Sequence, residues 1–252
     1  MSNNIVALIP ARSGSKRVKN KNISTLKEHP LIAYTIQSAL DSKIFKEVIV
    51  STDSIEIKKI SEYYGAKVPF LRPKEYSQDT SPDIQWVEHA LDYLNNSGSN
   101  YDIYSLLRPT SPFRKPETIL RAFNLFHSKE CDSLRAIEKC LQHPCKMWVL
   151  NDGFMVPFVN LEEKGPHNQP LHSSQYPSLP EVYVQNASLE IAYTKTINNF
   201  KNISGEKIIP FITTENEGFD LNIEEDWELA KILISNGKAK LPKIKKKSYL
   251  KI

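Results

Sequence analysis

Short apolar runs alternate along the chain with segments whose apolar residues recur at helical spacing, and this alternation limits the possible folds most strongly. Strands are predicted for the apolar runs at residues 4–10, 46–52, 66–70, 102–109, 132–140, 182–193 and 205–212. Amphipathic helices are predicted at residues 30–40, 54–65, 82–94, 117–126 and 223–234. Such alternation indicates an α/β fold, with a mostly parallel central sheet and helices on both faces.

The pattern predicts one domain over residues 1–252 with two irregular parts. The strand–helix alternation breaks at 139–183, a stretch rich in Pro, His, Asn and Gln with scattered aromatic residues. We interpret this stretch as an insertion, either a lid or a dimerisation arm. Residues 238–252 form a lysine-rich tail, expected to be solvated and partly disordered, with a nucleic-acid or membrane contact as the alternative.

Composition argues against several classes of protein. The net charge of +4 is mild, so nucleic acid is not an expected partner. No apolar stretch approaches the roughly 18 residues that a membrane span needs, and the N-terminus lacks the features of a signal peptide. Cys131, Cys140 and Cys145 are odd in number and lack CxxC spacing, which favours buried or incidental thiols. A cytoplasmic protein without a membrane partner is therefore expected.

The loop after the first predicted strand, within IPARSGSKRVKNKN, carries five basic residues between Arg12 and Lys21, and no acidic residue occurs before Glu28. Backbone N–H groups near Gly14 can approach a phosphate closely, while Arg12 and Lys21 supply charge. Neither the Walker A pattern nor GxGxxG is present. The loop's position after a strand favours a polyphosphate site over a merely solvated basic loop.

Asp220 and Asn222, in GFDLNIEEDW, stand two residues apart, so they share one side of an extended segment. Their oxygens suit Mg²⁺, which is commonly held by one or two carboxylates together with substrate phosphates. Asn222 has a second interpretation, because Glu225 follows it at the spacing of a capping box. The two roles are compatible.

Two further loops follow predicted strands. In LLRPTSPFR, Arg108 and Arg114 flank Thr110 and Ser111, and these side chains suit a carboxylate or sugar hydroxyls, unless the segment is an ordinary turn. In LRPKEYSQDTSPD, a base or ribose could be recognised by the side chains of Arg72, Asp79, Thr80 and Ser81. Ser81 and Pro82 are also expected to be the N-cap and first residue of a helix.

Taken together, these loops resemble those of the N-acylneuraminate cytidylyltransferases, also called CMP-sialic acid synthetases. The motifs IPARSGSKRVKNKN, STDS, DTSPD, RPTSPFR and FDLNIEEDW follow in that family's order across nearly the whole chain. The resemblance implies a Rossmann-like nucleotidyltransferase fold and, in most members, a homodimer with an inserted arm. It also implies a reaction in which the anomeric hydroxyl of a nine-carbon 2-keto sugar acid attacks the α-phosphorus of CTP. CMP-sugar forms, pyrophosphate leaves, and Mg²⁺ is the cofactor.

The same resemblance implies roles for individual residues of this sequence. The expected catalytic residues are Arg12, Lys21 and Asp220, with Asp220 and Asn222 as metal ligands. The nucleotide is expected to contact Ala11, Arg12, Ser13, Gly14, Ser15, Lys21, Asn22, Arg72, Thr80 and Ser81. The sugar acid is expected to contact Arg108, Thr110, Ser111, Lys146, Gln185, Asn186 and Glu190, with Lys146 entering the neighbouring subunit's site.

Three positions depart from the sialic acid pattern. Arg108 replaces the usual Gln, Asn186-Ala187-Ser188 replaces NGA, and Asn222 replaces a second Asp. The first two fall where the sugar is expected, so the chain is more similar to synthetases for bacterial relatives such as legionaminic acid. Two alternatives stay open: a cytidylyltransferase for the eight-carbon acid Kdo, and a non-catalytic nucleotide or nucleic-acid binding protein.

Overall fold

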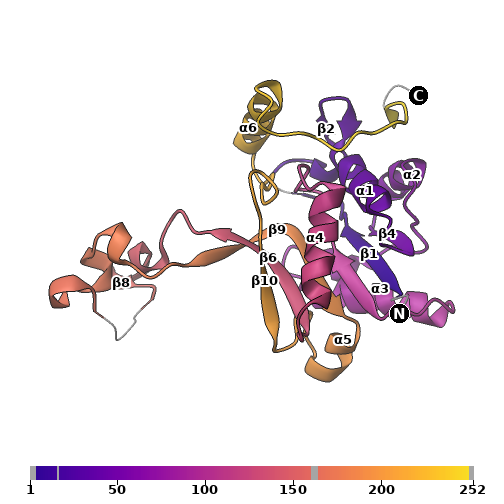
Figure 1. The fold of residues 1–252 in the computed structure, drawn as a ribbon. Helices are drawn as coiled ribbons and strands as arrows, with labels where there is room; N and C mark the ends of the chain where they lie inside the picture. The colour runs from indigo at the N-terminus through magenta and orange to yellow at the C-terminus, as the bar shows by residue number, and fades with distance from the viewer. Residues whose placement is uncertain (1–3, 16, 160–163, 250–252) are drawn as a thin grey trace. The chain divides into compact units, whose positions relative to one another are not determined.

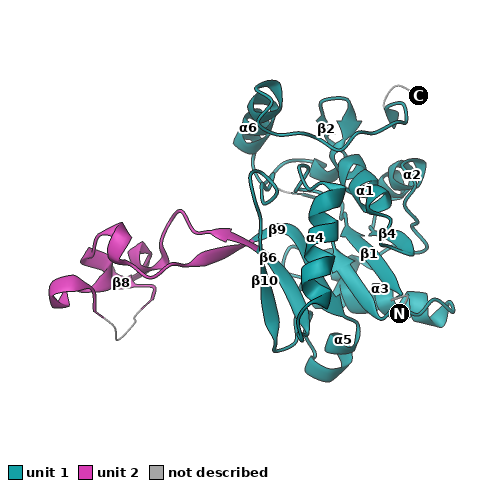
Figure 2. Ribbon diagram, viewed as in Figure 1, with its two compact units in different colours: residues 1–136, 186–252 teal, residues 137–185 magenta. Residues whose placement is uncertain are grey.

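The computed structural model describes residues 4–15, 17–159 and 164–249. The chain divides into two compact units, one formed by residues 1–136 and 186–252 and the other by residues 137–185 (Figure 2). The insertion expected at 139–183 falls within the second unit.

The first unit is built on a six-stranded sheet (Figure 1). Its strands are β1 (Ile5–Pro10), β4 (Glu47–Ser51), β5 (Ile103–Leu106), β6 (Ser133–Lys139), β9 (Tyr183–Tyr193) and β10 (Ile208–Ile212), in the order β10-β6-β9-β5-β1-β4. β1 runs parallel to both β4 and β5, whereas β9 runs antiparallel to β5. The mostly parallel sheet expected from the sequence is confirmed.

Helices cover both faces of this sheet, as expected. Successive side chains of a strand point to opposite faces, and along β1 Ala7 and Ile9 belong to one buried cluster while Val6 and Leu8 belong to another. The first cluster includes apolar residues of α1 (Leu31–Ser42), α2 (Ile55–Tyr63) and α4 (Pro116–His127). The second includes those of α3 (Asp83–Asn96) and α5 (Lys195–Phe200).

A third cluster lies under α6 (Glu224–Ser235) and a small hairpin, β2 (Thr25–Leu26) with β3 (His29–Pro30). Trp227 of α6 and Leu26 of the hairpin both belong to it. This packing joins the C-terminal part of the chain to the region just after the basic loop.

Two local expectations were wrong. Residues 66–70 form no strand but a single parallel bridge between Lys67 and Ile49; Pro69, which lacks an N–H donor, follows two residues later. Helix α3 begins at Asp83, with Pro82 at the N-cap position. The hydroxyl of Ser81 instead accepts from the backbone N–H of Gln78 and donates to the carbonyl of Glu75.

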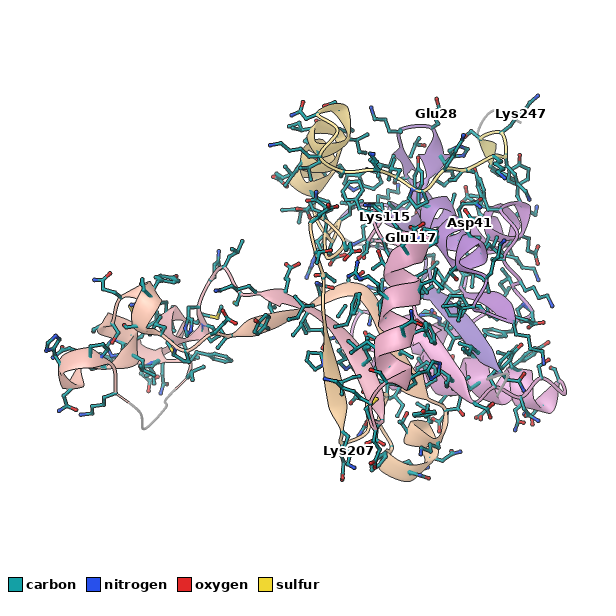
Figure 3. All side chains as sticks on the ribbon, viewed as in Figure 1. Glu28, Asp41, Lys115, Glu117, Lys207 and Lys247 are labelled. Atoms are coloured by element: carbon teal, nitrogen blue, oxygen red, sulfur yellow. The ribbon has the colours of Figure 1, made fainter. Side chains whose placement is uncertain are left out.

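The described part of the lysine-rich tail, residues 238–249, makes contacts with the rest of the first unit, and its expected partial disorder stays a prediction. The Tyr249 N–H donates to the Tyr64 hydroxyl at 3.1 Å, and the Tyr63 hydroxyl donates to the carbonyl of Lys247 at 3.0 Å (Lys247 is labelled in Figure 3). Ile244 packs against the core. The apolar residues between the lysines therefore dock this segment on the end of α2 (Ile55–Tyr63).

The second unit contains an antiparallel hairpin, β7 (Trp148–Asn151) with β8 (Phe154–Pro157). The 3-10 turns around it are η3 (Pro144–Lys146), η4 (Pro166–Asn168), η5 (Leu171–Ser173) and η6 (Tyr176–Ser178). Large apolar side chains of the hairpin are exposed, including Leu150, Phe154 and Met155. In the described parts of the chain, no helix combines the length and apolar character that crossing a bilayer requires.

Candidate active site

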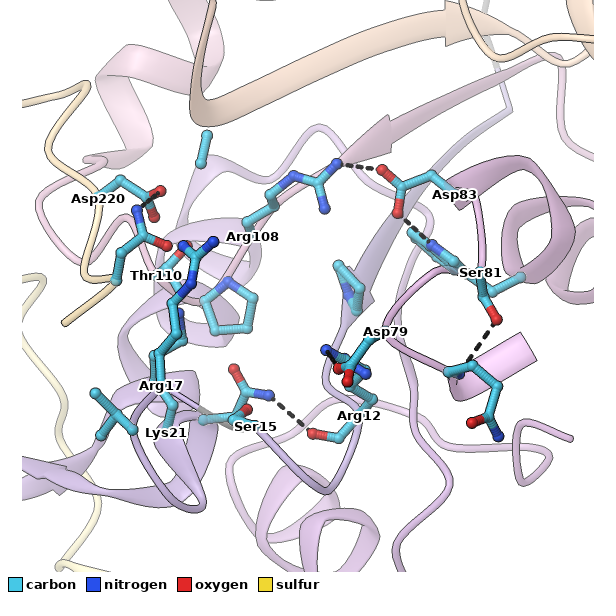
Figure 4. A pocket seen from close by; sticks show the side chains of 18 of the residues that line it. Arg12, Ser15, Arg17, Lys21, Asp79, Ser81, Asp83, Arg108, Thr110 and Asp220 are labelled. Carbon is cyan, nitrogen blue, oxygen red and sulfur yellow. Dashed lines mark hydrogen bonds and ion pairs between the residues drawn. The ribbon is translucent and has the colours of Figure 1, made fainter. Parts of the chain in front are cut away.

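Strand directions gather the expected site at one edge of the sheet. The carboxyl ends of β1, β4 and β5 lie together because these strands are parallel. β9 runs antiparallel to β5, and its Glu190 pairs with Leu106, the last residue of β5. The residues of β9 that precede Glu190, including Ala187, therefore lie at the same edge of the sheet. Side chains from these loops line a cavity of about 530 Å³ in the first unit (Figure 4).

The basic loop after β1 is held by a carboxylate that the sequence did not single out for chemistry. Asp53, just after β4, accepts from both the backbone N–H and the hydroxyl of Ser13, each at 2.6 Å. Gly14 follows with a left-handed φ of +69°, a conformation that glycine adopts without steric cost. Ser15 lines the cavity. Asp53 thus fixes the turn from which the loop presents its cations.

Arg12 lies on the cavity wall and bonds to the segment that precedes α3, at the end of η2 (Lys74–Ser77) and just after it. Its guanidinium donates to the carbonyl of Ser77 at 3.1 Å and to the carboxylate of Asp79 at 2.6 Å. Both members of the ion pair are about one-third exposed. The guanidinium is therefore tethered on one side and still reachable from the cavity.

Lys21 stands at the start of η1 (Lys21–Ile23) on another wall of the cavity. Its Nζ donates to the backbone carbonyl of Leu221 at 2.8 Å. Burial lowers the pKa of Lys21, an effect that nearby Asp220 opposes and Arg17 reinforces. Asn22 is buried and donates to the carbonyl of Arg12 at 3.2 Å, so it braces the basic loop from behind while also lining the cavity.

Asp220 and Asn222 face the cavity together, and Asn222 Nδ2 donates to one carboxylate oxygen of Asp220 at 2.6 Å. The other oxygen, Oδ1, is buried and has no hydrogen-bond partner among the described residues. An orphaned, buried carboxylate oxygen fits a site for a divalent cation. No group of three His, Cys, Asp or Glu side chains suited to a metal occurs in the described ranges, so the remaining ligands of such a cation would be oxygens of other kinds.

The expected capping role of Asn222 was wrong. Helix α6 begins at Glu224 with Ile223 at the N-cap position, and the carboxylate that closes this end belongs to Asp226. Asp226 accepts from the backbone N–H groups of Asn222 at 2.6 Å and Ile223 at 2.9 Å. The side chain of Asn222 is therefore left for Asp220 and the cavity.

Arg72 is buried against the sheet edge. It donates to the hydroxyl and carbonyl of Ser51 and stacks on Trp86, with its guanidinium carbon 4.9 Å from the ring centroid. Burial lowers the pKa of Arg72 to about 10, although Asp53 and Asp83 act in the opposite direction. Trp86 donates in turn to Asp83 at 2.8 Å. Arg72 and Trp86 therefore form a rigid cavity wall that couples a cation to an aromatic ring.

Arg108 belongs to a row of alternating charges. Its NH2 donates to Asp83 at 2.5 Å and to Glu190 at 3.2 Å, and Glu190 also pairs with Arg135 (Arg108 and Asp83 point toward each other in Figure 4). Burial would raise the pKa of Asp83, but the charge and hydrogen bond of Arg108 hold that pKa below its ordinary value. Burial likewise opposes the charge of Arg108, yet the two carboxylates raise its pKa overall.

Arg114 does not face the cavity, so its expected contact with a substrate was wrong. Its side chain is 1% exposed and donates to the carbonyls of Arg108 and Ser188 and to the hydroxyl of Thr35. Burial lowers the pKa of Arg114 to about 9. Arg114 therefore braces the Arg108 loop from the interior. The sequence pattern could not separate the two arginines, because both flank the same turn.

The expected site residues divide into three groups. Those that line the cavity are Arg12, Ser15, Lys21, Asn22, Arg72, Ser81, Arg108, Thr110, Asp220 and Asn222. Those of the first unit that lie outside its lining are Ala11, Ser13, Gly14, Thr80, Ser111, Asn186 and Glu190. Those in the second unit are Lys146 and Gln185.

Several residues outside the lining have other contacts. Ala11 and Ser111 are buried, and Asn186 donates to the hydroxyl of Thr213 at 2.9 Å. Lys146 donates within its own unit to the carbonyls of His172 and Ser174, at 2.7 and 2.6 Å. The roles expected for Lys146 and Gln185 stay predictions.

Sequence reasoning gave no role to several residues that line the cavity, among them Arg17, Asp83 and Trp86. Asp83, the last residue of LRPKEYSQDTSPD, and Trp86 stand three apart in the first turn of α3. A polar and an aromatic residue at that spacing share one helix face, and this signal was available. Arg17 was visible as part of the basic loop, although nothing in its spacing set it apart.

The fold and the cavity together indicate the class of protein. An α/β unit whose parallel strands end in a basic loop, an orphaned carboxylate oxygen and a polar cavity has the arrangement of a nucleotide-dependent transferase. Residues 6–144 match the family described as cytidylyltransferase. The chain belongs to this family and is a nucleotidyltransferase enzyme.

Similar proteins of known name narrow the family. The chain is 35% identical to CMP-N,N'-diacetyllegionaminic acid synthase of Legionella pneumophila, over 91% of this chain and 96% of that protein. It is 32% identical to N-acylneuraminate cytidylyltransferase of Escherichia coli, over 91% of this chain but about half, 52%, of that longer protein. It is 31% identical to pseudaminic acid cytidylyltransferase of Campylobacter jejuni, over 90% of this chain and 95% of that protein. The resemblance found in the sequence motifs is confirmed.

Solved structures confirm the fold. A CMP:2-keto-3-deoxy-manno-octonic acid synthetase complexed with CTP superimposes with a TM-score of 0.65 at 13% identity, covering 93% of this chain and 99% of that one. A 4-diphosphocytidyl-2C-methyl-D-erythritol synthase from Anaerococcus prevotii gives a TM-score of 0.61, also at 13% identity, covering 93% of this chain and all of that one. At this identity the likeness concerns the Rossmann-like fold alone.

Proposed function

We propose that this enzyme activates a nonulosonic acid, a nine-carbon 2-keto sugar acid, with CTP to give the CMP-sugar and pyrophosphate. The observation that carries the proposal is the convergence of Arg12, Lys21 and Asp220 on one cavity from loops far apart in the sequence. The three named relatives, all synthases or cytidylyltransferases of such acids, support the substrate class.

The cations of the cavity suit the triphosphate. Arg12 and Lys21 approach from different walls, and Arg17 lies near Lys21 (Figure 4). Because little covalent chemistry falls to the protein in phosphoryl-type transfer, positioning and charge neutralisation provide most of the rate enhancement. In this proposal Arg12 and Lys21 hold the phosphates and stabilise the charge that develops on the departing pyrophosphate.

Asp220 and Asn222 would hold Mg²⁺, since Asp220 Oδ1 is buried and without a partner among the described residues. When bound there, Mg²⁺ neutralises phosphate charge and acidifies a nearby hydroxyl. Asn222 keeps Asp220 oriented through its 2.6 Å hydrogen bond. The sugar's anomeric oxygen forms a bond to the α-phosphorus, the bond from that phosphorus to pyrophosphate breaks, and the hydroxyl proton is released.

The cytosine base of CTP is proposed to lie near Arg72, Trp86 and Asn22. These residues form a preorganised wall, because Arg72 is fixed on Ser51 and Asn22 on the carbonyl of Arg12. A preorganised wall loses little conformational entropy when a ligand binds. Cytosine offers ring and carbonyl acceptors that such donors suit.

We propose that the enzyme is a homodimer and that its second unit forms the contact between the two copies. The β7–β8 hairpin exposes Leu150, Phe154 and Met155 by 78%, 75% and 58%, respectively. Exposed apolar residues gathered on one short element are typical of a protein–protein contact. Sedimentation at micromolar concentration checks this, with a dimer expected for the native chain and a monomer after Phe154→Asp.

Pyrophosphate release from CTP tests the proposed activity. Purified enzyme is given CTP and Mg²⁺ with N-acetylneuraminic, diacetyllegionaminic, pseudaminic or Kdo acid, one at a time. Pyrophosphate release is expected with at least one nine-carbon acid. With Kdo the release should be weak or absent. Release with Kdo alone would favour the eight-carbon alternative, and no release with any acid would contradict the proposal.

A further inference from the structure

The cavity has two walls of different electrostatic character. On one side burial and the nearby charge of Arg17 lower the pKa of Lys21, while Asp220 and Asp226 oppose that shift (Figure 4). On the other side Arg108 faces the cavity with its charge already matched by Asp83 and Glu190. The two sides therefore differ, because Arg108 is held in ion pairs with two carboxylates whereas Lys21 donates to a backbone carbonyl.

The charges around Arg108 balance locally. The NH2 group of Arg108 donates to both Asp83 and Glu190, so one positive charge meets two negative ones. Arg135 pairs with the other oxygen of Glu190 and supplies the second positive charge. Glu190 is 8% exposed and Asp83 about one-third exposed, so the Asp83 carboxylate is the anion that an incoming ligand would meet. A ligand carboxylate brought to Arg108 would approach Asp83 at the same time, and like charges at close range repel.

Arg108 nevertheless keeps unused donors. A guanidinium has five N–H groups in a rigid fork. In Arg108 only NH2 makes hydrogen bonds with the described residues, which leaves Nε and NH1 without acceptors. The side chain is 29% exposed and held in place by two carboxylates, so these donors have a fixed direction. A fixed donor with balanced charge suits a neutral acceptor such as a hydroxyl or an amide carbonyl.

We propose that Arg108 is a specificity-determining residue that donates to a neutral oxygen of the sugar acid, a hydroxyl or N-acyl carbonyl, and does not bind its carboxylate. This inference rests on the proposed function, because it assigns one group of that substrate to one side chain. Asp83 and Glu190 are positioning residues: they hold the guanidinium and remove its attraction for anions.

A chemical double-mutant cycle tests the proposal. The best sugar acid of the wild-type enzyme is compared with analogues that lack one neutral group each, a hydroxyl replaced by hydrogen or an N-acyl group removed. A further analogue has the carboxylate replaced by a carboxamide. Values of kcat/KM are measured for wild type and for Arg108→Met, with CTP affinity measured in parallel.

For one neutral group, we expect deletion to lower kcat/KM about tenfold in wild type and less than twofold in Arg108→Met. The carboxamide should lose the same factor in both proteins, and CTP affinity should change less than twofold. The proposal is overturned if each neutral deletion costs the same in both proteins, or if the carboxamide penalty is the one that disappears.

Two controls keep the result interpretable. Arg121→Met is the matched control, because Arg121 pairs with buried Glu217 and does not line the cavity; it should leave every analogue ratio unchanged. Arg108→Lys keeps the charge but loses the fork, and it gives the same test if the Met variant fails to fold. If wild type itself releases no pyrophosphate with any sugar acid, the proposed function has failed and the inference fails with it.

Discussion

The Nζ of Lys21 donates to the backbone carbonyl of Leu221 at 2.8 Å, across a sequence separation of 200 residues. This bond joins the basic loop that follows the first strand to the segment that carries Asp220. The expected phosphate-binding and metal-binding residues thereby line the same cavity.

Lys21→Met should lower kcat/KM for CTP by about two orders of magnitude, because a cation directed at developing phosphate charge is lost. Since burial lowers the pKa of Lys21, wild-type activity should fall on the alkaline side at a lower pH than a free lysine would give. The expected control is Lys21→Arg, which should move that alkaline limb to higher pH. A pH–rate profile of kcat/KM measures both effects. If wild type and Lys21→Arg lost activity at the same alkaline pH, the assignment of that limb to Lys21 would be contradicted.

The same pKa shift affects stability in a definite direction. Between the lowered folded value and the unfolded value near about 10.4, the unfolded chain binds more protons than the folded one. The free energy of unfolding contributed by Lys21 therefore rises with pH through that window. Denaturant titrations of wild type and Lys21→Met across the window should converge at its upper end.

Arg12→Ala should lower CTP affinity by about tenfold or more while changing the free energy of unfolding by less than about 1 kcal/mol. The ion pair with Asp79 is partly exposed, so its loss costs little. Because Asp79 shares the guanidinium with an incoming phosphate, Asp79→Asn should raise CTP affinity about two- to fivefold. Calorimetric titration with CTP decides both, and a weaker affinity in Asp79→Asn would instead make Asp79 a positioning residue for Arg12.

Asp220→Asn should remove most of the metal-dependent part of CTP binding, by about tenfold or more, because the orphaned Oδ1 is replaced by a neutral group. Mn²⁺ binding followed by electron paramagnetic resonance, with and without CTP, reads this out independently of turnover. Asn222→Asp is the matched control and should strengthen Mn²⁺ binding by adding a carboxylate beside Asp220. Equal Mn²⁺ affinity in all three proteins would remove the metal from this site.

Truncation after Pro242 should lower the free energy of unfolding by about 1–3 kcal/mol, because the bonds of Tyr249 to Tyr64 and of Tyr63 to Lys247 are lost. CTP turnover should stay within about twofold of the full chain. Thermal denaturation and a pyrophosphate assay measure the two effects. If truncation instead abolished a tight, salt-sensitive affinity for RNA, the nucleic-acid alternative would be favoured.

Much of the fold could be predicted because periodicity is a local signal. The strand at 46–52 and the helix at 117–126 each follow from apolar spacing, and β4 and α4 occupy those regions. The short run at 66–70 could not be settled in this way. Its apolar residues fit a strand, yet Lys67 makes only one bridge.

The cavity position of Arg12 and Lys21 could be predicted because their loop follows β1, and that of Asp220 and Asn222 because they stand two residues apart in one segment. The site was not predicted where a distant contact decides the role. Arg108 and Arg114 flank the same turn, but only Arg108 meets Asp83 and Glu190 at the cavity, while Arg114 turns inward to Ser188 and Thr35. Such a difference depends on which elements pack behind the loop, and local spacing does not carry it.

The most direct test of the central claim is the fate of the α-phosphorus of CTP, followed by ³¹P nuclear magnetic resonance in a reaction with a nonulosonic acid. The account predicts one new phosphodiester signal, from the CMP-sugar, growing at the same rate as pyrophosphate. Free CMP with pyrophosphate from the outset would show hydrolysis without transfer, and unchanged CTP with every nine-carbon acid would show no activation; either result would contradict the account.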